Sequence, residues 1–196
     1  MLIKEAGGVC MCGRYRFSPN ENDEIKRIFD LASKNSSEIK TGVVFPSDTT
    51  ALILADEEKN IQVTGMQWGF PGFKPSQLII NARSETVKEK KMFSKAFQTT
   101  RCVFPTTGFF EWNKEKSKYL FTLSAQPVYI CGFYKTFKEG SRSIIMTTEP
   151  NQSVLPIHDR MPLLIEKSEI KRYLTNDDFA GEYLKKAMPE LTVEEV

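Results

Sequence analysis

The apolar positions along the chain predict three helical regions. The clearest has one apolar face formed by Ile25, Ile28, Phe29 and Ala32, spaced at i, i+3, i+4 and i+7. Its start is predicted after Ser18, because Ser18-Pro19-Asn20-Glu21 supplies a capping serine, a proline at the first helical position and a glutamate three residues after the cap. A second helix is predicted over Lys88–Phe97, and paired short helices over Ser168–Leu174 and Phe179–Ala187.

Short β-rich runs, several of them separated by turn residues, lie between these helices. They are Thr50–Leu54, Ile61–Trp68, Cys102–Phe104, Phe109–Trp112, Tyr119–Leu123, Val128–Tyr134, Ile144–Thr147 and Pro162–Ile165. Because strands mostly follow strands, the pattern favours an α+β domain with a curved, mainly antiparallel, barrel-like sheet flanked by short helices. A parallel doubly wound sheet is disfavoured.

Length and composition indicate a soluble protein with one main domain. The chain has 196 residues, of which 40% are hydrophobic and 27% charged. No apolar run approaches the ~18 residues that a membrane span needs, and Met1–Val9 does not resemble a secretory signal. We therefore expect a cytoplasmic protein. A net charge of +2 neither indicates nor excludes a nucleic-acid partner.

The four cysteines are Cys10, Cys12, Cys102 and Cys131, and His158 is the only histidine. A structural zinc site needs four Cys or His ligands, and Cys10-x-Cys12 with two scattered cysteines is a poor match. Disulfides are not expected in a chain without an export signal. No metal or other cofactor is therefore predicted, and at least one cysteine is available for chemistry.

Four segments are unusually rich in polar and aromatic residues, whereas phosphate-binding loops, a G-x-S-x-G elbow and an H-E-x-x-H motif are missing from the sequence. The segments are Met11–Tyr15, Asn81–Glu85, Gly108–Trp112 and His158–Pro162. Together they supply a cysteine nucleophile and two proton-transfer groups, Glu111 and His158.

Each of these residues also has a structural interpretation. Cys12 could be a small buried apolar residue, and His158 could be held by Asp159 and Arg160. Glu111 lies in an apolar strand, where a carboxylate is costly unless it is paired or functional; Arg101 or a lysine of Lys114–Lys118 could pair with it. Residue by residue, the structural interpretation is the stronger one.

Taken in order, the segments resemble the SRAP family (SOS response-associated peptidase). The matching motifs are Cys12-Gly13-Arg14-Tyr15, Trp68-Gly69-Phe70, Asn81-Ala82-Arg83-Ser84-Glu85, Arg101-Cys102-Val103-Phe104-Pro105, Gly108 to Trp112, Thr147-Thr148, and Ile157-His158-Asp159-Arg160-Met161-Pro162. The resemblance implies a barrel-like antiparallel sheet. It also implies a DNA-damage function, in which abasic sites in single-stranded DNA, for example at replication forks, are bound covalently by a cysteine that has become the N-terminus.

By motif position, the resemblance makes Cys12 that cysteine, with Asn81, Glu111 and His158 as its companions. The residues expected to contact DNA are Arg14, Arg83 and Arg160 at phosphates, Trp68 and Trp112 against bases, and Pro46 along the cleft. An N-terminal cysteine carries an amine and a thiol on adjacent carbons, so it can close a thiazolidine ring on the aldehyde of an abasic site. The protein is expected to act as a monomer without a membrane partner, associated with the nucleoid when it is bound to DNA.

The chain departs from the family pattern at its beginning, because residues 1–10 precede Met11-Cys12. We expect residues 1–10 to be an extension or the product of a misassigned start codon, and residues 11–196 to form the domain. Two alternatives stay open: a thiol-dependent peptidase that removes its own leader, and a module that binds single-stranded DNA without a covalent step. Strand cleavage by a lyase step is a further expectation.

Overall fold

The computed structural model describes residues 12–36, 38–74, 76–124 and 126–196. The strands are β1 (Arg14–Phe17), β2 (Gly42–Val44), β3 (Thr49–Ala55), β4 (Ile61–Trp68), β5 (Phe70–Pro71), β6 (Leu78–Ile79), β7 (Asn81–Arg83), β8 (Arg101–Thr106), β9 (Gly108–Trp112), β10 (Lys118–Thr122), β11 (Val128–Phe137), β12 (Gly140–Thr148), β13 (Met161–Pro162) and β14 (Thr192–Glu195). The α-helices are α1 (Asp23–Asn35), α2 (Ser94–Thr99), α3 (Ile170–Thr175) and α4 (Asp177–Tyr183). Residues 1–11, which include the extension and Met11, lie outside the described residues.

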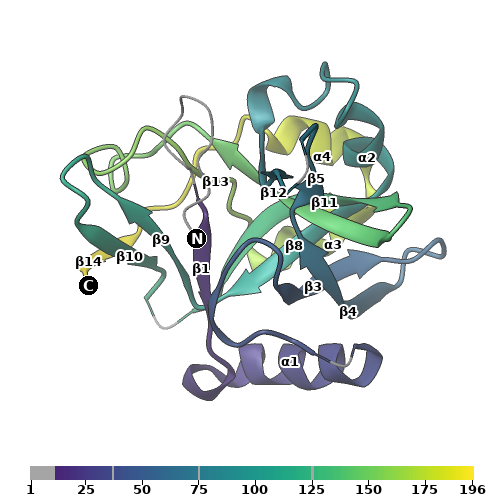
Figure 1. The fold of residues 1–196 in the computed structure, drawn as a ribbon, viewed down its shortest axis with the longest axis horizontal. Coiled ribbons are helices and arrows are strands. Elements are labelled where there is room, and N and C mark those ends of the chain that lie inside the picture. The colour runs from purple at the N-terminus through teal and green to yellow at the C-terminus, as the bar shows by residue number, and fades with distance from the viewer. Residues whose placement is uncertain (1–11, 37, 75, 125) are drawn as a thin grey trace.

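Five strands close a barrel in the order β8-β3-β4-β12-β11, because β11 pairs with both β8 and β12. All of these pairings are antiparallel except that of β4 with β12. A second sheet runs in the order β14-β10-β9-β1-β2 and lies beside the barrel on the left of Figure 1. The predicted α+β fold with a barrel-like, mainly antiparallel sheet is confirmed.

Aromatic packing joins the second sheet to the barrel. Tyr15 on β1 is buried against Trp68 on β4, with ring centroids 5.4 Å apart, and against Phe104 on β8 at 6.2 Å. Aromatic pairs of this kind contribute about 0.5–1.5 kcal/mol beyond the area that they bury. Because Tyr15 is fixed in the barrel, the residues just before it, including Cys12, are held at the junction of the two sheets.

Helix α1 packs across one end of the barrel, below the sheets in Figure 1. Ile25, Ile28 and Ala32 are buried, so the predicted apolar face is confirmed. The predicted start is wrong, however. Pro19–Glu21 forms a separate 3-10 helix, and Asn22 caps α1 by accepting hydrogen bonds from the amides of Glu24 and Ile25.

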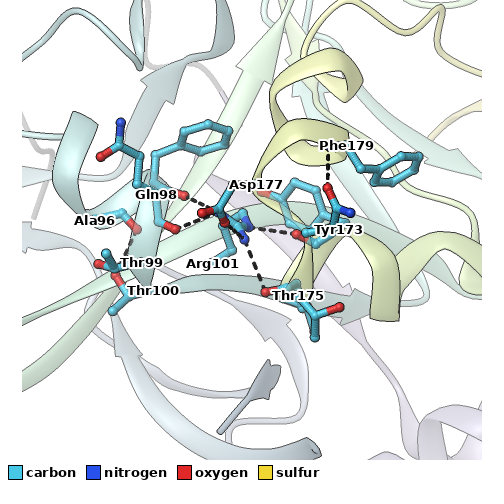
Figure 2. A network of polar contacts seen from close by, with 12 residues as sticks. Ala96, Gln98, Thr99, Thr100, Arg101, Tyr173, Thr175, Asp177 and Phe179 are labelled. Carbon is cyan, nitrogen blue, oxygen red and sulfur yellow. Dashed lines mark hydrogen bonds and ion pairs between the residues drawn. The ribbon is translucent and has the colours of Figure 1, made fainter. Parts of the chain in front are cut away.

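Helices α2, α3 and α4 gather around Arg101, the first residue of β8 (Figure 2). Its buried guanidinium donates to the carbonyl oxygens of Phe97 and Gln98 near the end of α2, and to those of Tyr173 and Leu174 in α3. It also pairs with Asp177 at 2.6 Å. The helix predicted over Lys88–Phe97 is shorter than expected and begins later, at Ser94. Arg101 pairs with Asp177 and not with Glu111.

None of the described helices is long and apolar enough to cross a membrane.

Candidate active site

Cys12 lies just before β1, beside the end of β9. The register places Arg14 opposite Phe110, so the chain before Arg14 runs alongside Glu111. The backbone N–H of Cys12 donates to Oε1 of Glu111 over 2.7 Å. Both residues are buried, with 2% and 1% of their surface exposed. Cys12 also has a φ of +40°, a left-handed conformation that is uncommon for a residue other than glycine.

Burial makes Glu111 an unusual carboxyl group. Loss of solvation raises its pKa to about 8, opposed by hydrogen bonds from the side chain and backbone of Cys12, while the charge of Asp159 adds to the rise. A carboxyl group with this pKa is largely protonated at neutral pH. It can therefore serve as a proton donor as well as an acceptor.

His158 completes a cluster with Cys12 and Glu111. Its Nε2 lies 3.9 Å from Oε2 of Glu111, and the residue is only 7% exposed. Nδ1 lies on the other side of the ring, where the amide of Arg160 donates to it over 3.1 Å. Oδ1 of Asp159 lies 3.3 Å from the same nitrogen, on a side chain that is 88% exposed. The structure thus brings together three of the four predicted catalytic residues.

Asn81, the fourth, is the first residue of β7 and is half-buried. It pairs with Ile145 of β12 in parallel register. Strand β12 also pairs with β13, the strand that follows His158 in the chain, so Asn81 and His158 are attached to the same strand from opposite sides. Its role in the site remains a prediction.

An aromatic and basic cluster lies next to Cys12 on the surface. The guanidinium of Arg14 is 4.8 Å from the ring centroid of Phe45 and 4.9 Å from that of Trp112. Phe45 is 40% exposed, and Pro46 follows it at a half-buried position. Phe45 was not among the residues that the sequence predicted to contact DNA, although its position next to Pro46 could have indicated it. Exposed rings with an arginine between them are typical of surfaces that bind single-stranded nucleic acids.

Burial argues against two of the predicted DNA contacts. Trp68 is fully buried in the barrel, where its indole N–H donates to the carbonyl oxygen of Ile80 over 3.1 Å, so it cannot stack on a base. Arg160 is 8% exposed, and its guanidinium binds Glu85 with both terminal nitrogens. Arg83, in contrast, is exposed at the end of β7.

The remaining cysteines in the described structure lie in the barrel core. Cys102 on β8 and Cys131 on β11 are fully buried, and burial raises the pKa of both thiols. Neither is suited to nucleophilic chemistry, because the thiolate is the reactive form. Among the described residues, no group of three or more His, Cys, Asp or Glu side chains is placed to hold a metal ion.

Fold and site together define a class of protein: a small closed barrel with a second sheet, at whose junction a buried cysteine, glutamate and histidine meet. The sequence profile of the SOS response associated peptidase (SRAP) family matches residues 11–196, and the chain belongs to that family.

Relatives named as abasic site processing proteins share most of the chain. The abasic site processing protein YedK of Escherichia coli (strain K12) is 26% identical over 180 residues, which cover 85% of this chain and 81% of that protein. The abasic site processing protein YoaM of Bacillus subtilis (strain 168) is 28% identical over 193 residues, with coverages of 89% and 84%.

Solved structures show the same fold. A crystal structure of a protein from Bordetella bronchiseptica aligns with a TM-score of 0.77 at 19% identity, covering 94% of this chain and 99% of that one. A second, from Bacteroides thetaiotaomicron, aligns with a TM-score of 0.76 at 20% identity, with coverages of 94% and 92%.

Proposed function

We propose that this protein traps abasic sites in single-stranded DNA as a covalent adduct through Cys12, after the residues before Cys12 have been removed. The contact between the Cys12 nitrogen and Oε1 of Glu111 carries the proposal. Once Cys12 is N-terminal, that nitrogen is an amine next to a buried carboxyl group that can exchange protons with it. The names of the relatives support abasic-site processing as the general function.

The reaction uses the amine and the thiol of Cys12 in succession. A terminal amine has a pKa of about 7.7–8.0, so a useful fraction is neutral near neutral pH. Its nitrogen attacks the aldehyde carbon of the ring-opened sugar and gives a carbinolamine. Protonated Glu111 donates a proton to the hydroxyl group, which leaves as water, and an iminium ion forms.

The second bond closes the ring. The Cys12 sulfur adds to the iminium carbon, the thiol proton returns to Glu111, and a five-membered thiazolidine results with the net loss of one water. Both nucleophiles belong to one residue, so this step gains from intramolecular proximity. His158 would act at the sugar oxygen or the phosphate, in strand cleavage or in crosslink reversal, and Asn81 would orient the amine or the sugar.

The test uses a chain that begins at Cys12 and single-stranded DNA with one abasic site. We expect an adduct that survives heat and detergent on a denaturing gel. Cys12→Ala should abolish it, whereas Cys131→Ala, which removes a core thiol, should not. Cys12→Ser keeps the amine but lacks the thiol, so its adduct should require borohydride reduction of the imine. A stable adduct with Cys12→Ala would overturn the proposal.

Self-processing is a second candidate function, favoured by the same hydrogen bond. The Cys12 nitrogen is the atom that would leave if the peptide bond before Cys12 were hydrolysed, and Glu111 is within 2.7 Å to protonate it. The left-handed conformation of Cys12 adds strain at this position, of order 1–3 kcal/mol. Intact-mass analysis of the full chain over time should then show a product that begins at Cys12, and Glu111→Gln should prevent its formation. An unchanged mass for the full chain would instead require another peptidase.

A binding module without covalent chemistry is the remaining outcome. It predicts that the Cys12-start chain binds single-stranded DNA in a salt-dependent manner and forms no adduct.

A further inference from the structure

Arg160 and Glu85 form a bidentate ion pair near His158, in which the arginine side chain is buried and the glutamate side chain is partly exposed. Nη1 of Arg160 lies 2.6 Å from Oε1 of Glu85, and Nη2 lies 2.9 Å from Oε2. Nη2 also donates to the carbonyl oxygen of Thr147 over 2.9 Å. The side chain of Arg160 is 10% exposed and that of Glu85 39%. Paired hydrogen bonds of this kind fix orientation as well as charge.

The pair joins three separate segments around the site. Glu85 lies in a 3-10 helix, Ser84–Thr86, that directly follows β7. Thr147 is on β12, and Arg160 immediately precedes β13. The turn that carries His158 is therefore anchored at its far end to two neighbouring elements through the side chain of one residue.

The backbone of Arg160 in turn contacts the ring of His158. Its amide N–H donates to Nδ1 over 3.1 Å, and a neutral imidazole nitrogen that accepts a hydrogen bond does not carry a hydrogen itself. Two acceptors compete with this amide: the carbonyl oxygen of Arg160 lies 3.2 Å from Nδ1 and Oδ1 of Asp159 lies 3.3 Å from it, and each would accept from Nδ1 only if Nδ1 were protonated. A small displacement of residue 160 would therefore change which nitrogen carries the proton.

We infer that Glu85 and Arg160 are positioning residues for His158, whose ion pair holds the Arg160 amide against Nδ1 and keeps the imidazole proton on Nε2, facing Glu111. Nε2 is buried and has no hydrogen-bond partner within the described structure, so its N–H is available to a ligand. Its distance of 3.9 Å from Oε2 of Glu111 leaves this hydrogen bond unmade. With the proton on Nε2, His158 acts first as a proton donor in the reaction. This catalytic consequence rests on the proposed function, whereas the position of the proton does not.

Nuclear magnetic resonance of the imidazole nitrogens tests the tautomer without DNA. His158 is the only histidine in the chain, so a sample without an affinity tag gives one unambiguous pair of ¹⁵N signals. At alkaline pH, where imidazoles are neutral, we expect Nε2 protonated and Nδ1 unprotonated. Glu85→Gln and Arg160→Lys should move the ¹⁵N chemical shifts of both ring nitrogens toward those of a mixture of tautomers, because neither variant keeps the bidentate ion pair.

A matched control comes from the same segment. Glu89→Gln removes a similar charge four residues further on, at an exposed position, and should leave the wild-type tautomer unchanged. A wild-type protein protonated on Nδ1, or a tautomer that persists in both ion-pair variants, would overturn the assignment.

Kinetics of the Cys12-start chain test the catalytic consequence. Glu85→Gln should slow whichever step His158→Ala slows, by roughly tenfold, a part of the ~10²–10⁴ that general acid–base catalysis provides. In a His158→Ala background it should have no further effect, because the two changes act through one group. Affinity for single-stranded DNA should not change.

Two other results separate the possibilities. Lower DNA affinity in Arg160→Lys, with the His158-dependent step intact, would make Arg160 a phosphate contact and overturn its positioning role. If the Cys12-start chain formed no adduct, the proposed function would fail, whereas the nitrogen shifts would still test the positioning of His158.

Discussion

Burial of Glu111 makes the stability of the protein depend on pH in an unusual direction. Its pKa in the folded state is about 8, against an ordinary value of 4.5, so the folded protein binds more protons than the unfolded chain between these values. The free energy of unfolding then falls as pH rises through this window, by on the order of 1 kcal/mol per pH unit from this group.

Glu111→Gln should remove that fall, because glutamine keeps the acceptor for the Cys12 amide but does not ionise. Urea unfolding of the full chain at acidic, neutral and mildly alkaline pH should show the variant gaining stability over the wild type as pH rises. Glu89→Gln, at an exposed position, serves as the control and should follow the wild type. Parallel curves for wild type and Glu111→Gln would contradict the raised pKa.

The two tryptophans have opposite roles. Trp112→Ala should weaken binding to single-stranded DNA by roughly 1–3 kcal/mol, the usual contribution of one stacked base, with little change in stability. Trp68→Phe should leave DNA binding unchanged and lower the free energy of unfolding by about 1–3 kcal/mol, because it leaves a void and removes the indole hydrogen bond to the carbonyl of Ile80. Fluorescence anisotropy and chemical unfolding measure the two effects. Equal losses of affinity in both variants would contradict this division.

At the scale of elements, Arg101 joins three helices to the barrel (Figure 2). Arg101→Met should lower the free energy of unfolding by at least about 3 kcal/mol, since it leaves several buried carbonyl oxygens without a donor. Asp177→Asn is the informative companion, because that side chain is 73% exposed and its ion pair should contribute at most about 1 kcal/mol. A larger loss for Asp177→Asn than for Arg101→Met, measured by urea unfolding, would mean that the salt bridge rather than the carbonyl contacts stabilises this junction.

The start of α1 offers a second comparison between elements. Asn22→Ala should destabilise the protein by about 1 kcal/mol, since it leaves the amides of Glu24 and Ile25 without their acceptor. Ser18→Ala should change stability by a few tenths of a kcal/mol at most, because Ser18 makes no side-chain capping bond. Thermal unfolding of the two variants decides between the observed cap and the one that the sequence pattern favoured.

Elements with a strong periodic pattern were predictable, and short ones were not. The strand predicted over Ile61–Trp68 has the bounds that the structure shows. Strand β1 was missed although Arg14–Phe17 alternates between outward and buried positions, because four residues are too few for the pattern to stand out. The predicted helix at Lys88–Phe97 failed at its first half, where the chain forms exposed turns closed by local backbone hydrogen bonds such as that from the amide of Lys90 to the carbonyl oxygen of Thr86.

At the scale of the whole molecule, the site could not be predicted from residue spacing alone. The Cys12 nitrogen and its acceptor on Glu111 are 99 positions apart, and only the closed barrel and its companion sheet bring them together. The resemblance to the SRAP family supplied the cluster that local patterns could not. It did not supply the pair of Glu85 and Arg160, 75 positions apart, although both residues lie in segments that stood out in the sequence.

Whole-molecule charge is equally uninformative about DNA binding, since 27 basic and 25 acidic residues nearly cancel. Local placement is more specific. Arg83 lies two residues after Asn81 in β7, so the two side chains lie on the same side of that strand. Arg14 is exposed at the start of β1, two residues after Cys12. If both arginines contact phosphates, the logarithm of the affinity for single-stranded DNA should fall with the logarithm of salt concentration with a slope near −1.4, about −0.7 per contact.

Binding titrations at several salt concentrations, on a Cys12-start chain carrying Cys12→Ala to prevent adducts, measure this slope. Arg14→Ala and Arg83→Ala should each make it shallower by about 0.7. Arg160→Lys should leave it unchanged, because the charge of Arg160 is already paired with Glu85. If Arg160→Lys made the slope as shallow as Arg14→Ala does, the ion pair between Arg160 and Glu85 would have to open when DNA binds. The guanidinium of Arg160 would then contact a phosphate in the complex instead of Glu85.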